Sequence, residues 1–568
     1  MAGTNEKRDL KEIVFVNHIL DNVHGFIGLT ELENRIEILP IFKRLQDISQ
    51  LGLVKRIFPG ALHNRYVHSL GVMHIIDQMA LHLKEFNAAE RQLLRLAGML
   101  HDLGHYPLSH DLEQVYDREG SVQRQRNIPI KEVFIEEAAE SIGKIVRVEE
   151  IEEGKPIPTE KMPKPKRKLV VKGAYHHESI TSKVIRNSNE IRKIIKYGIE
   201  EGYFDEPERS LSTISDSKEI YSCATKIIND ICALIQGDGD YQYQTEGAFP
   251  KHFTAMIQLL HSELDADRID YLLRDATFSG AAYGTFDIGL LLQNLAMKEY
   301  TTGTETAWIV GVKEKGIGCA DQYMMNRYLA YTQVIFHKYT SIIGKMLREV
   351  VLWMMNQPGF GFYDQDEIDR IIEDHENSGF YFAFTDSYFF NYLNAIDKGK
   401  SGCPDDIYYF VEQLKKFRSL EVDFEDIFAG NANHQKKHIE TSDCYKYILE
   451  LEKRNAFDIV DGLYLFDNKK ITDHVPYEIF EKNFKAYSDT HKEELTEEEM
   501  SRGKSDAAKL SFDKYKIDRL MDGLAVISND PNVEPMLLID APRSMTTEIY
   551  DVCQLMCRKY LMNVTDAV

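Results

Sequence analysis

Histidine and aspartate residues gather in three short segments of this sequence. His68 lies in the first segment, His101 and Asp102 follow an apolar stretch, and Asp267 lies in the third segment. Two neutral imidazoles and two carboxylates form a mixed nitrogen and oxygen ligand set, which suits Mn²⁺, Mg²⁺, Fe²⁺, Zn²⁺ or Ni²⁺ and leaves coordination positions open. Metal-assisted hydrolysis requires such an open position, because the ion lowers the pKa of a water molecule and neutralises charge on a phosphoryl oxygen. The four residues therefore predict a hydrolytic centre with a divalent metal ion as cofactor.

Three helices must bring these residues together. From about Ile13 to Leu112 the apolar residues follow three-and-four spacing, which predicts helices joined by short loops. Asn87-Ala-Ala-Glu90 has the pattern of a reciprocal N-terminal cap and opens the helix that runs into His101-Asp102. Helical spacing resumes near His177 and continues to about Leu295, so Asp267 is expected on a helix as well.

The segments around the four residues resemble the HD-domain metal-dependent phosphohydrolases. His68, His101-Asp102 and Asp267 match the H…HD…D signature of that family in order and spacing. The runs 58–71, 101–110 and 267–275 are similar to the branch of deoxynucleoside triphosphate triphosphohydrolases, which includes bacterial dGTPases and the animal enzyme that joins a sterile-alpha-motif domain to an HD domain. The resemblance covers about residues 30–345. It implies attack of a metal-activated water on the α-phosphorus of a 2′-deoxynucleoside 5′-triphosphate, which releases deoxynucleoside and inorganic triphosphate.

The resemblance also implies roles for residues near the metal set. His105, His110 and His177 would face the phosphates, where one imidazole carries positive charge beside an oxyanion or protonates the leaving oxygen. Glu113 stands where the family has an acidic residue close to such a histidine. Glu178 follows His177 as in the family's His-Glu pair. Both glutamates are equally well explained as surface carboxylates.

A triphosphate needs local cations in a chain whose formal net charge is −23. Arg65 lies three residues before His68, and Arg268 directly follows Asp267, where its guanidinium can hold two phosphate oxygens. Arg327 matches an arginine in the family's phosphate-clamping helix. The alternative for each arginine is an ordinary salt bridge on a helix surface.

Sugar recognition is expected along one helical stripe. Arg268, Tyr271 and Asp275 are spaced i, i+3 and i+7 beside Asp267. The resemblance implies that Tyr271 packs on the deoxyribose, where its ring would exclude a 2′-hydroxyl, and that Asp275 receives the 3′-hydroxyl. Gln50 matches a glutamine that touches the same hydroxyl. The alternative is that Tyr271 is a core residue.

Other features of the family carry over less completely. Ile38, Lys43 and Gln46 occupy the positions that help to form an activating nucleotide site in the animal enzyme, and Ile38 cannot read a guanine edge by charge.

Two alternative functions remain open. One is another HD phosphohydrolase that acts on a nucleoside monophosphate, an alarmone or a cyclic nucleotide, although Leu103–Tyr106 stands where alarmone hydrolases have an acidic pair. The other is a nucleotide-sensing assembly protein with a vestigial site.

We expect a mainly α fold, in which an HD-domain helical bundle is joined by a small β insertion and a mixed α+β C-terminal region. Residues 1–142 would form the first part of the bundle, and 173–345 the rest. Between them, 143–172 is rich in basic residues and proline and predicts an exposed insertion. Residues 346–568 would form the C-terminal region, with a role in oligomerisation or regulation.

The composition limits the classes of partner. The 568 residues include 68 Lys+Arg and 91 Asp+Glu, and this acidic balance disfavours nucleic acid and anionic membranes, which need a broad basic surface. No apolar run has the length of a membrane span and the N-terminus lacks a signal-peptide pattern, so a cytoplasmic protein is expected. Seven scattered cysteines indicate no disulfide framework. The resemblance implies a dimer or tetramer that binds a deoxynucleoside triphosphate and a nucleotide activator.

Overall fold

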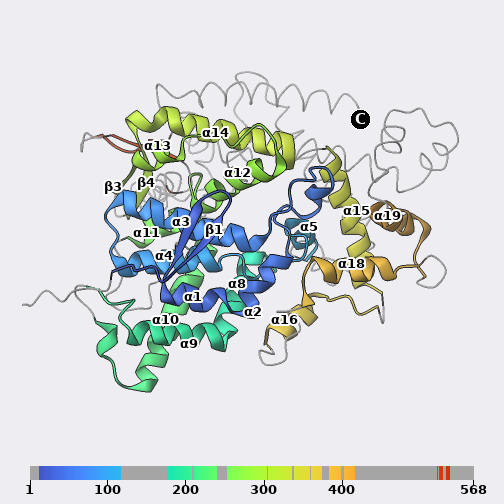
Figure 1. Ribbon diagram of the computed structural model, residues 1–568, viewed down its shortest axis with the longest axis horizontal. Coiled ribbons are helices and arrows are strands. Elements are labelled where there is room, and N and C mark those ends of the chain that lie inside the picture. Colours follow the sequence, from blue (N-terminus) through green and yellow to red (C-terminus); the bar gives the residue numbers. More distant parts are fainter. Residues whose placement is uncertain are drawn as a thin grey trace, which may run out of the picture.

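A helical bundle carries the three segments singled out above. The computed structural model describes residues 12–116, 175–206, 210–238, 252–302, 305–335, 338–357, 360–373, 383–397, 402–415, 521, 524–528 and 533–537. The central helices are α3 (Arg65–Leu83), α4 (Ala88–Leu100), α10 (Ser217–Gln236) and α12 (Ala266–Ser279). Helix α3 packs against both α4 and α12, and α10 covers α4 from the other side (Figure 1). The described residues confirm the expected mainly α fold with small sheets.

Local capping explains where the central helices begin. The Asn87 side chain accepts from the N–H of Glu90, and the Glu90 carboxylate accepts from the N–H of Asn87, which confirms the predicted reciprocal cap of α4. Asn64 caps α3 through the N–H of Val67, and Asp265 caps α12 through the N–H of Arg268. These caps set the first turns of the two helices that carry His68 and Asp267.

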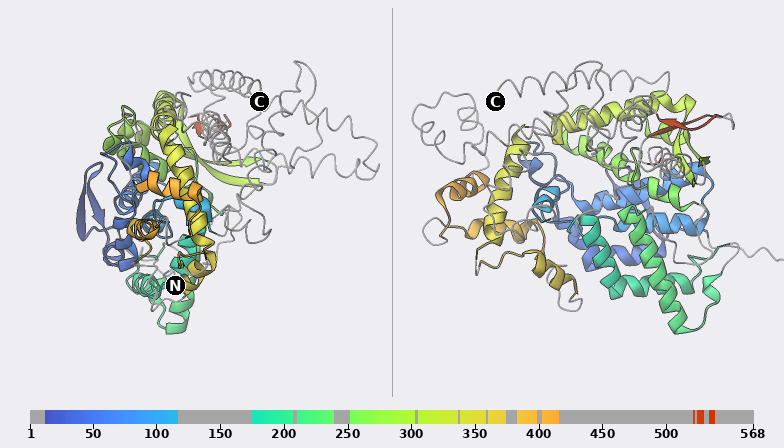
Figure 2. Two further views of the ribbon diagram at one scale, coloured as in Figure 1. Left: turned by 90° about the vertical axis from the view of Figure 1, so that its right-hand side faces the viewer. Right: turned by 180° about the vertical axis from the view of Figure 1, so that it is seen from behind.

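The N-terminal part of the expected helical segment is a β-hairpin, so the prediction of helices from Ile13 onward was wrong there. Strands β1 (Asn17–Asp21) and β2 (Gly25–Leu29) pair antiparallel. The Asp21 carboxylate accepts from the N–H groups of Val23 and His24, and Gly25 supplies a φ of +71°, so the turn is fixed locally. The hairpin lies along one side of the bundle (Figure 2).

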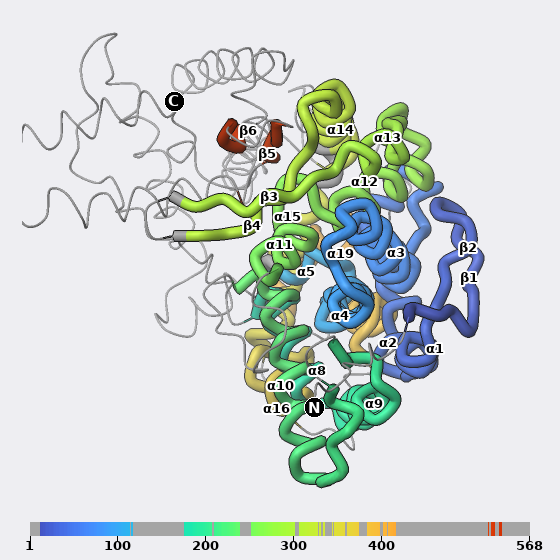
Figure 3. Tube along the Cα trace, turned by 90° about the vertical axis from the view of Figure 1, so that its left-hand side faces the viewer, coloured from blue at the N-terminus to red at the C-terminus, as the bar shows by residue number. Residues whose placement is uncertain are grey.

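A second sheet joins distant parts of the chain. Strands β3 (Leu295–Thr302) and β4 (Glu305–Lys313) form an antiparallel pair, which confirms the β segment expected at 306–312. Strand β5 (Ala525–Ile527) adds parallel to β4, and β6 (Met536–Leu537) follows it (Figure 3). A side chain on Gly311 would overlap the carbonyl oxygen of Ala525, so glycine permits this strand to approach.

The remaining elements surround this framework. They are α1 (Glu31–Glu37), α2 (Pro40–Lys43), η1 (Arg44–Asp47), η2 (Gly52–Arg56), α5 (His110–Gln114), α8 (His177–Asn187), α9 (Asn189–Glu200), η5 (Leu211–Thr213), α11 (Phe253–Gln258), α13 (Ile288–Gln293), η6 (Glu314–Gly316), α14 (Ile317–Ala330), the π-helical turn η7 (Tyr331–Ile335), α15 (Lys338–Met355), α16 (Gln365–Glu373), α18 (Asp386–Ala395) and α19 (Asp405–Lys415). Helix α15 packs against α5 and α19, so the chain beyond residue 345 lies directly beside the bundle.

One large apolar cluster runs through the described part of the chain, from Ile27 in the hairpin to Val526 in β5. Four cysteines fall in these ranges, and all four are free. Among the described helices, none combines the length and apolarity that crossing a membrane demands. The predicted insertion at 143–172 and the predicted domain boundary at 142 lie outside the described residues, and the boundary at 345 falls within α15.

Candidate metal centre

Three helices bring the four expected metal ligands together. His68 lies on α3, His101 is the C-cap of α4 with Asp102 next to it, and Asp267 lies in the first turn of α12. His68 Nε2 is 2.9 Å from Asp267 Oδ1. His101 Nε2 is 3.4 Å from Asp102 Oδ1 and 3.9 Å from Asp267 Oδ1. One ligand atom from each of the four residues therefore faces a common point.

Hydrogen bonds at the far side of each ring fix this orientation. His68 Nδ1 lies 2.7 Å from Asp270 Oδ2, and His101 Nδ1 lies 2.8 Å from the carbonyl oxygen of Gly98. Because both acceptors bind an N–H, each imidazole presents the lone pair of Nε2 to the cluster. Asp270 was not singled out from the sequence, although it lies one helical turn after Asp267 and shares its face of α12.

The residues fit a divalent cation. Among the described residues, His101 Nε2 and Asp102 Oδ1 are buried and have no hydrogen-bond partner, and the neighbour of His68 Nε2 is another expected ligand, Asp267. Buried polar atoms without partners are rare and costly, and here two of them converge with His68 Nε2 in a set with metal-ligand spacing. A cation would satisfy all three atoms at once. The Asp267 side chain is 39% exposed, so the cluster is open on the side of α12.

Charge on the cluster favours binding of a cation. Burial alone would lower the pKa of His68, but the Asp267 and Asp270 carboxylates outweigh it and raise this pKa to about 10. Burial would raise the pKa of Asp102, yet Arg65 and the surrounding histidines hold it well below its usual range. The centre is therefore negative enough to attract a proton or a metal ion.

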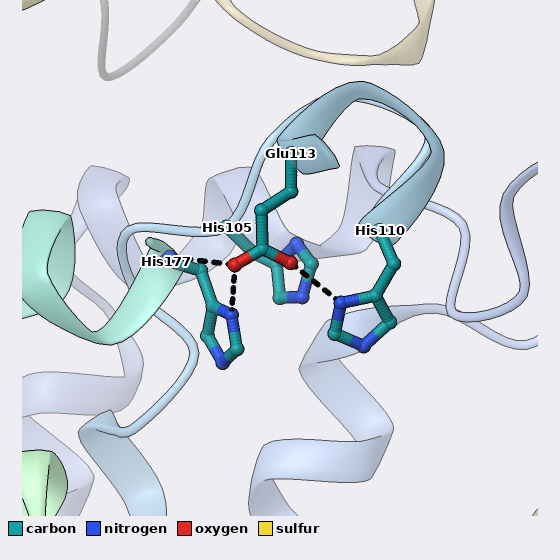
Figure 4. Close-up of side chains that lie close together, drawn as sticks. All are labelled: His105, His110, Glu113 and His177. Carbon is teal, nitrogen blue, oxygen red and sulfur yellow. Dashed lines mark hydrogen bonds and ion pairs between the residues drawn. The ribbon is translucent and has the colours of Figure 1, made fainter. Parts of the chain in front are cut away.

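A second cluster lies next to the first and contains the expected catalytic residues. His105, His110 and His177 surround the Glu113 carboxylate (Figure 4). His110 Nδ1 is 2.6 Å from Glu113 Oε2, and His177 Nδ1 is 2.6 Å from Glu113 Oε1, which also accepts from the His177 N–H at 2.8 Å. Glu113 is buried, so it is an ordered partner of two rings rather than a surface carboxylate.

His105 is a neutral donor within this cluster. Its Nδ1 accepts from the N–H of Tyr106 at 3.1 Å, so Nε2 carries the proton. Burial, with Arg65 and His177 nearby, holds the pKa of His105 well below its usual range. Its ring stacks on His177 with centroids 4.5 Å apart. Among the described residues Nε2 has no hydrogen-bond partner, so this buried N–H is available to an oxygen of a ligand.

Close backbone packing joins the two clusters. A side chain on Gly104 would overlap the N–H of Thr181, so glycine allows α8 to lie against the turn that follows Asp102. The Thr181 hydroxyl accepts from the Gly104 N–H at 2.8 Å and donates to the His101 carbonyl at 2.9 Å. As a result His177 Nε2 lies 4.0 Å from Asp102 Oδ1.

The three expected phosphate-binding arginines have carboxylate partners in the structure. Arg65 is buried, and its Nη1 donates to Asp102 Oδ2 at 2.8 Å. Arg268 Nη1 donates to Glu263 Oε1 at 3.1 Å, and Arg327 Nη1 donates to the other oxygen of Glu263. Arg65 thus binds Asp102, one of the expected metal ligands, while Glu263 binds both Arg268 and Arg327. Glu263 was not singled out from the sequence.

Two of the expected sugar-binding residues share one neighbour. The Gln50 N–H donates to the carbonyl of His63 at 3.1 Å, and His63 Nε2 lies 2.8 Å from Asp275 Oδ1. Gln50 Oε1 is buried without a hydrogen-bond partner among the described residues. Tyr271 is half-buried on α12 and packs against the main apolar cluster. His63 is a further polar residue of this region that the sequence did not mark as functional.

Two of the residues at the expected activator positions, Lys43 and Gln46, share one polar neighbour, the Tyr66 hydroxyl. Ile38 is 66% exposed, and Lys43 pairs with Glu37. A nucleotide activator stays a prediction.

Residues 65–177 match the family model of the HD domain. The range contains His68, His101, Asp102 and the residues of the second cluster, whereas Asp267 lies beyond it. The His/Asp cluster is of the kind that holds a divalent metal in HD domains.

Comparison with curated proteins gives partial matches. The chain is 24% identical over 314 residues to the uncharacterized protein YwfO of Bacillus subtilis (strain 168), which covers 55% of this chain and 49% of that protein. The chain thus spans about half the length of this relative. It is 41% identical over 116 residues to the deoxynucleoside triphosphate triphosphohydrolase SAMHD1 of Gallus gallus, which covers 19% of each protein. It is 44% identical over 98 residues to the human SAMHD1, which covers 16% of each. A solved structure of a hypothetical protein from Aquifex aeolicus is similar with a TM-score of 0.44 and 23% identity, and covers 70% of this chain and 75% of that one.

Proposed function

We propose that this HD-domain protein is a metal-dependent phosphohydrolase that cleaves 2′-deoxynucleoside 5′-triphosphates to deoxynucleosides and inorganic triphosphate. The observation that carries the proposal is the contact between the buried His/Asp cluster and the cluster around Glu113, with His177 Nε2 4.0 Å from Asp102 Oδ1. The first cluster fits a metal ion, and the second offers proton donors beside it. This combination suits hydrolysis of a phosphate ester.

The choice of substrate within the phosphohydrolases rests on similarity. The chain is 41% identical to the Gallus gallus SAMHD1 over 116 residues and 44% identical to the human SAMHD1 over 98 residues. Those relatives are deoxynucleoside triphosphate triphosphohydrolases by name. We extend that substrate class to this chain.

His68, His101, Asp102 and Asp267 would hold the metal ion. When bound, the ion would activate a water molecule and neutralise charge on a phosphoryl oxygen. Arg65 keeps the Asp102 carboxylate in place through its bond to Oδ2, so that Oδ1 faces the centre. Asp270 does the same for His68 by holding its Nδ1–H.

The second cluster would bind the phosphate chain and supply the proton. The His105 Nε2–H donates to a non-bridging oxygen, because this ring is neutral and its other nitrogen is occupied by the Tyr106 N–H. His110 is 59% exposed and paired with Glu113, so it can exchange protons with water and deliver one to the departing 5′-oxygen. Its bond to the buried Glu113 carboxylate holds the ring in this position.

Arg268 and Arg327 would bind the outer phosphates. Both guanidinium groups meet on Glu263, so a polyanion arriving there faces two cations held side by side. The pair formed by Asp275 and His63, with Gln50 beside it, would receive the sugar. Tyr271 would exclude a 2′-hydroxyl from the same side of α12.

A matrix of nucleotides tests the proposal. The metal-loaded protein is incubated with each of the four dNTPs, alone and in the presence of each other nucleotide, and the products are separated by anion exchange. We expect deoxynucleoside and inorganic triphosphate in equal amounts, and none from the Asp267→Ala variant, because that variant lacks a metal ligand. Release of only monophosphate or pyrophosphate would contradict the proposed reaction.

A further inference from the structure

The carboxylate of Asp386 holds together two loops of the active site from a distant part of the chain. Asp386 is the first residue of α18, and the residue is buried. Its Oδ1 accepts from the N–H of Leu108 at 2.7 Å. Its Oδ2 accepts from the hydroxyl of Ser49 at 2.5 Å and from the Ser49 N–H at 3.2 Å, and Lys55 Nζ lies 3.5 Å away. Arg56, a few residues after Ser49, also contacts α18 by lying over the ring of Phe390, but the Asp386 carboxylate bonds to both loops.

The loop that contains Leu108 has an unfavourable backbone conformation. Leu108 and Ser109 have φ values of +56° and +57°, and residues other than glycine rarely adopt such positive φ values. Such a turn persists only where the surroundings enforce it. The bond from the Leu108 N–H to Asp386 holds this turn from outside its own segment, together with the bonds that the Ser109 hydroxyl makes to Ser49 and Arg65.

The turn determines where the catalytic cluster lies. Helix α5 begins directly after Ser109, and the Glu113 N–H donates to the Ser109 carbonyl at 3.2 Å. His110 and Glu113 are therefore placed by the conformation of Ser109. A change at Leu108 would rotate the first turn of α5 and move both side chains relative to His177.

The same turn is linked to the metal ligands. The Ser109 hydroxyl donates to the carbonyl of Ser49 at 2.6 Å and accepts from Arg65 Nε at 2.9 Å. Arg65 Nη1 in turn donates to Asp102 Oδ2 at 2.8 Å. A continuous path of hydrogen bonds thus joins Asp386 to Asp102 through Ser49, Ser109 and Arg65.

We propose that Asp386 is a positioning residue of the hydrolytic site. It acts through Leu108 and Ser49: it stabilises the left-handed turn, sets the start of α5 and keeps Arg65 on Asp102. The helices beyond residue 345 would then complete the active site rather than form a separate module. The kinetic part of this inference rests on the proposed function, whereas the structural part does not.

Two variants of Asp386 test its proposed positioning role against a matched control. Asp386→Ala removes all four contacts, and Asp386→Asn retains an oxygen that can accept from Leu108. Asp364→Ala is the control, because Asp364 likewise lies at the start of a helix of the C-terminal part, directly before α16. Its carboxylate, however, accepts from the N–H of Glu367 within that helix. Hydrogen exchange is measured on the full chain for the amides of 47–54 and 105–113, together with those of α3 and α4.

We expect at least tenfold faster exchange in 47–54 and 105–113 for Asp386→Ala, an intermediate effect for Asp386→Asn, and no change there for Asp364→Ala. Exchange in α3 and α4 should stay as in the wild type. Unchanged exchange in both loops would overturn the proposal, as would a uniform increase over the whole bundle. If Asp386→Ala does not fold, Asp386→Asn decides by the same criteria.

Kinetics separate positioning from a merely structural role. With a dNTP that the wild type hydrolyses, we expect kcat of Asp386→Ala to fall about 10- to 100-fold, while KM changes less than about threefold and bound metal per chain is unchanged. An unchanged kcat, or a loss that follows loss of metal, would overturn the positioning role. If the wild type hydrolyses no dNTP, the proposed function fails, and the exchange result still judges Asp386.

Discussion

At the scale of single residues, the site depends on carboxylates that hold other side chains. Asp270 accepts from His68 Nδ1, from His24 Nε2 at 2.5 Å and from Arg274 Nε at 2.8 Å. The guanidinium of Arg274 and the hydrogen bonds from both histidines outweigh burial and hold the pKa of Asp270 well below its usual range. Asp270 is therefore a permanent anion behind the candidate metal ligand His68, and it fixes the orientation of that ring.

Asp270→Asn should weaken metal binding by about 10- to 100-fold, because the amide no longer offers a charged acceptor to His68. The measurement is competition of the protein with a chromogenic chelator for Mn²⁺ or Zn²⁺. Asp77→Asn is the control, since Asp77 is also a buried carboxylate on α3's core face and pairs with Arg91 and Arg95 away from the centre. Equal losses of affinity in both variants would contradict a specific role for Asp270.

His74 gives a stability prediction that depends on pH. Burial, with His24 and Arg95 nearby, lowers the pKa of His74 from 6.5 to about 4. Since the unfolded chain takes up this proton near pH 6.5 and the folded chain only near 4, stability is fully present above pH 6.5 and declines as the pH falls toward 4.

The variant His74→Gln should lose less stability than the wild type between pH 7 and pH 4.5, by up to about 3 kcal/mol. Urea unfolding of the metal-free proteins at both pH values measures this difference. Parallel losses in the two proteins would show that His74 does not titrate as the structure indicates.

The sequence identified most of the residues that come together, but not those that orient them. The candidate metal ligands were found from residue type, order and spacing, and the histidines around Glu113 from the resemblance to a known family. Asp270 could have been found as well, because it lies on the same face of α12 as Asp267. Glu263 and Asp386 could not, since their partners Arg327, Ser49 and Leu108 are distant in sequence and only the folded chain brings them together.

At the scale of helices and strands, the close approach of α3 to α12 determines the geometry of the candidate metal centre. A side chain on Gly71 would overlap Asp270 Oδ1 and would lie 2.5 Å from Arg274 Nη2. Glycine at this position therefore lets α3 and α12 pack closely enough for His68 to reach both Asp267 and Asp270. The contact explains why a glycine lies three residues after His68 in the interior of α3, where glycine is otherwise unfavourable.

Gly71→Ala should push α12 away from α3, which would destabilise the fold by about 1–3 kcal/mol and weaken metal binding. Gly318→Ala is the control, because Gly318 lies in helix α14 with nothing within 4 Å of an added side chain, and alanine there should be neutral or stabilising. Thermal unfolding and metal titration measure both effects. Metal binding by Gly71→Ala that equals the wild type would contradict the role of this helix contact.

Some helices and strands were predicted correctly from the sequence, and others were not. The caps of α4 and the strand at 305–313 follow from local sequence and were expected. The hairpin of β1 and β2 was mistaken for helix because its short apolar run also fits helical spacing, although the Asp21 turn and Gly25 were visible signals. The pairing of β5 with β4 could not be predicted, because it joins residues about two hundred positions apart.

At the scale of the whole molecule, charge separates the surface from the site. The chain has a formal net charge of −23, yet the two clusters contain several histidines, and Arg65 binds Asp102 beside them. An acidic surface repels long polyanions, and a small anion can still enter a local cationic region. We therefore expect a free nucleotide rather than nucleic acid as the ligand. Dimer or tetramer formation stays a prediction from resemblance.

Single-stranded DNA should accordingly bind with a Kd weaker than about 100 μM at 0.15 M salt, whereas inorganic triphosphate should bind the metal-loaded protein more tightly. Fluorescence anisotropy of a labelled oligonucleotide and calorimetry with triphosphate provide the two values. Tight DNA binding that weakens steeply with salt would contradict the charge argument.

The most direct test of the proposed reaction is hydrolysis of a dNTP by the metal-loaded protein in water enriched in oxygen-18, followed by mass spectrometry of the products. Attack on the α-phosphorus predicts one labelled oxygen in inorganic triphosphate and an unlabelled deoxynucleoside. Label in the deoxynucleoside, or products that consist of labelled monophosphate or pyrophosphate, would contradict the account.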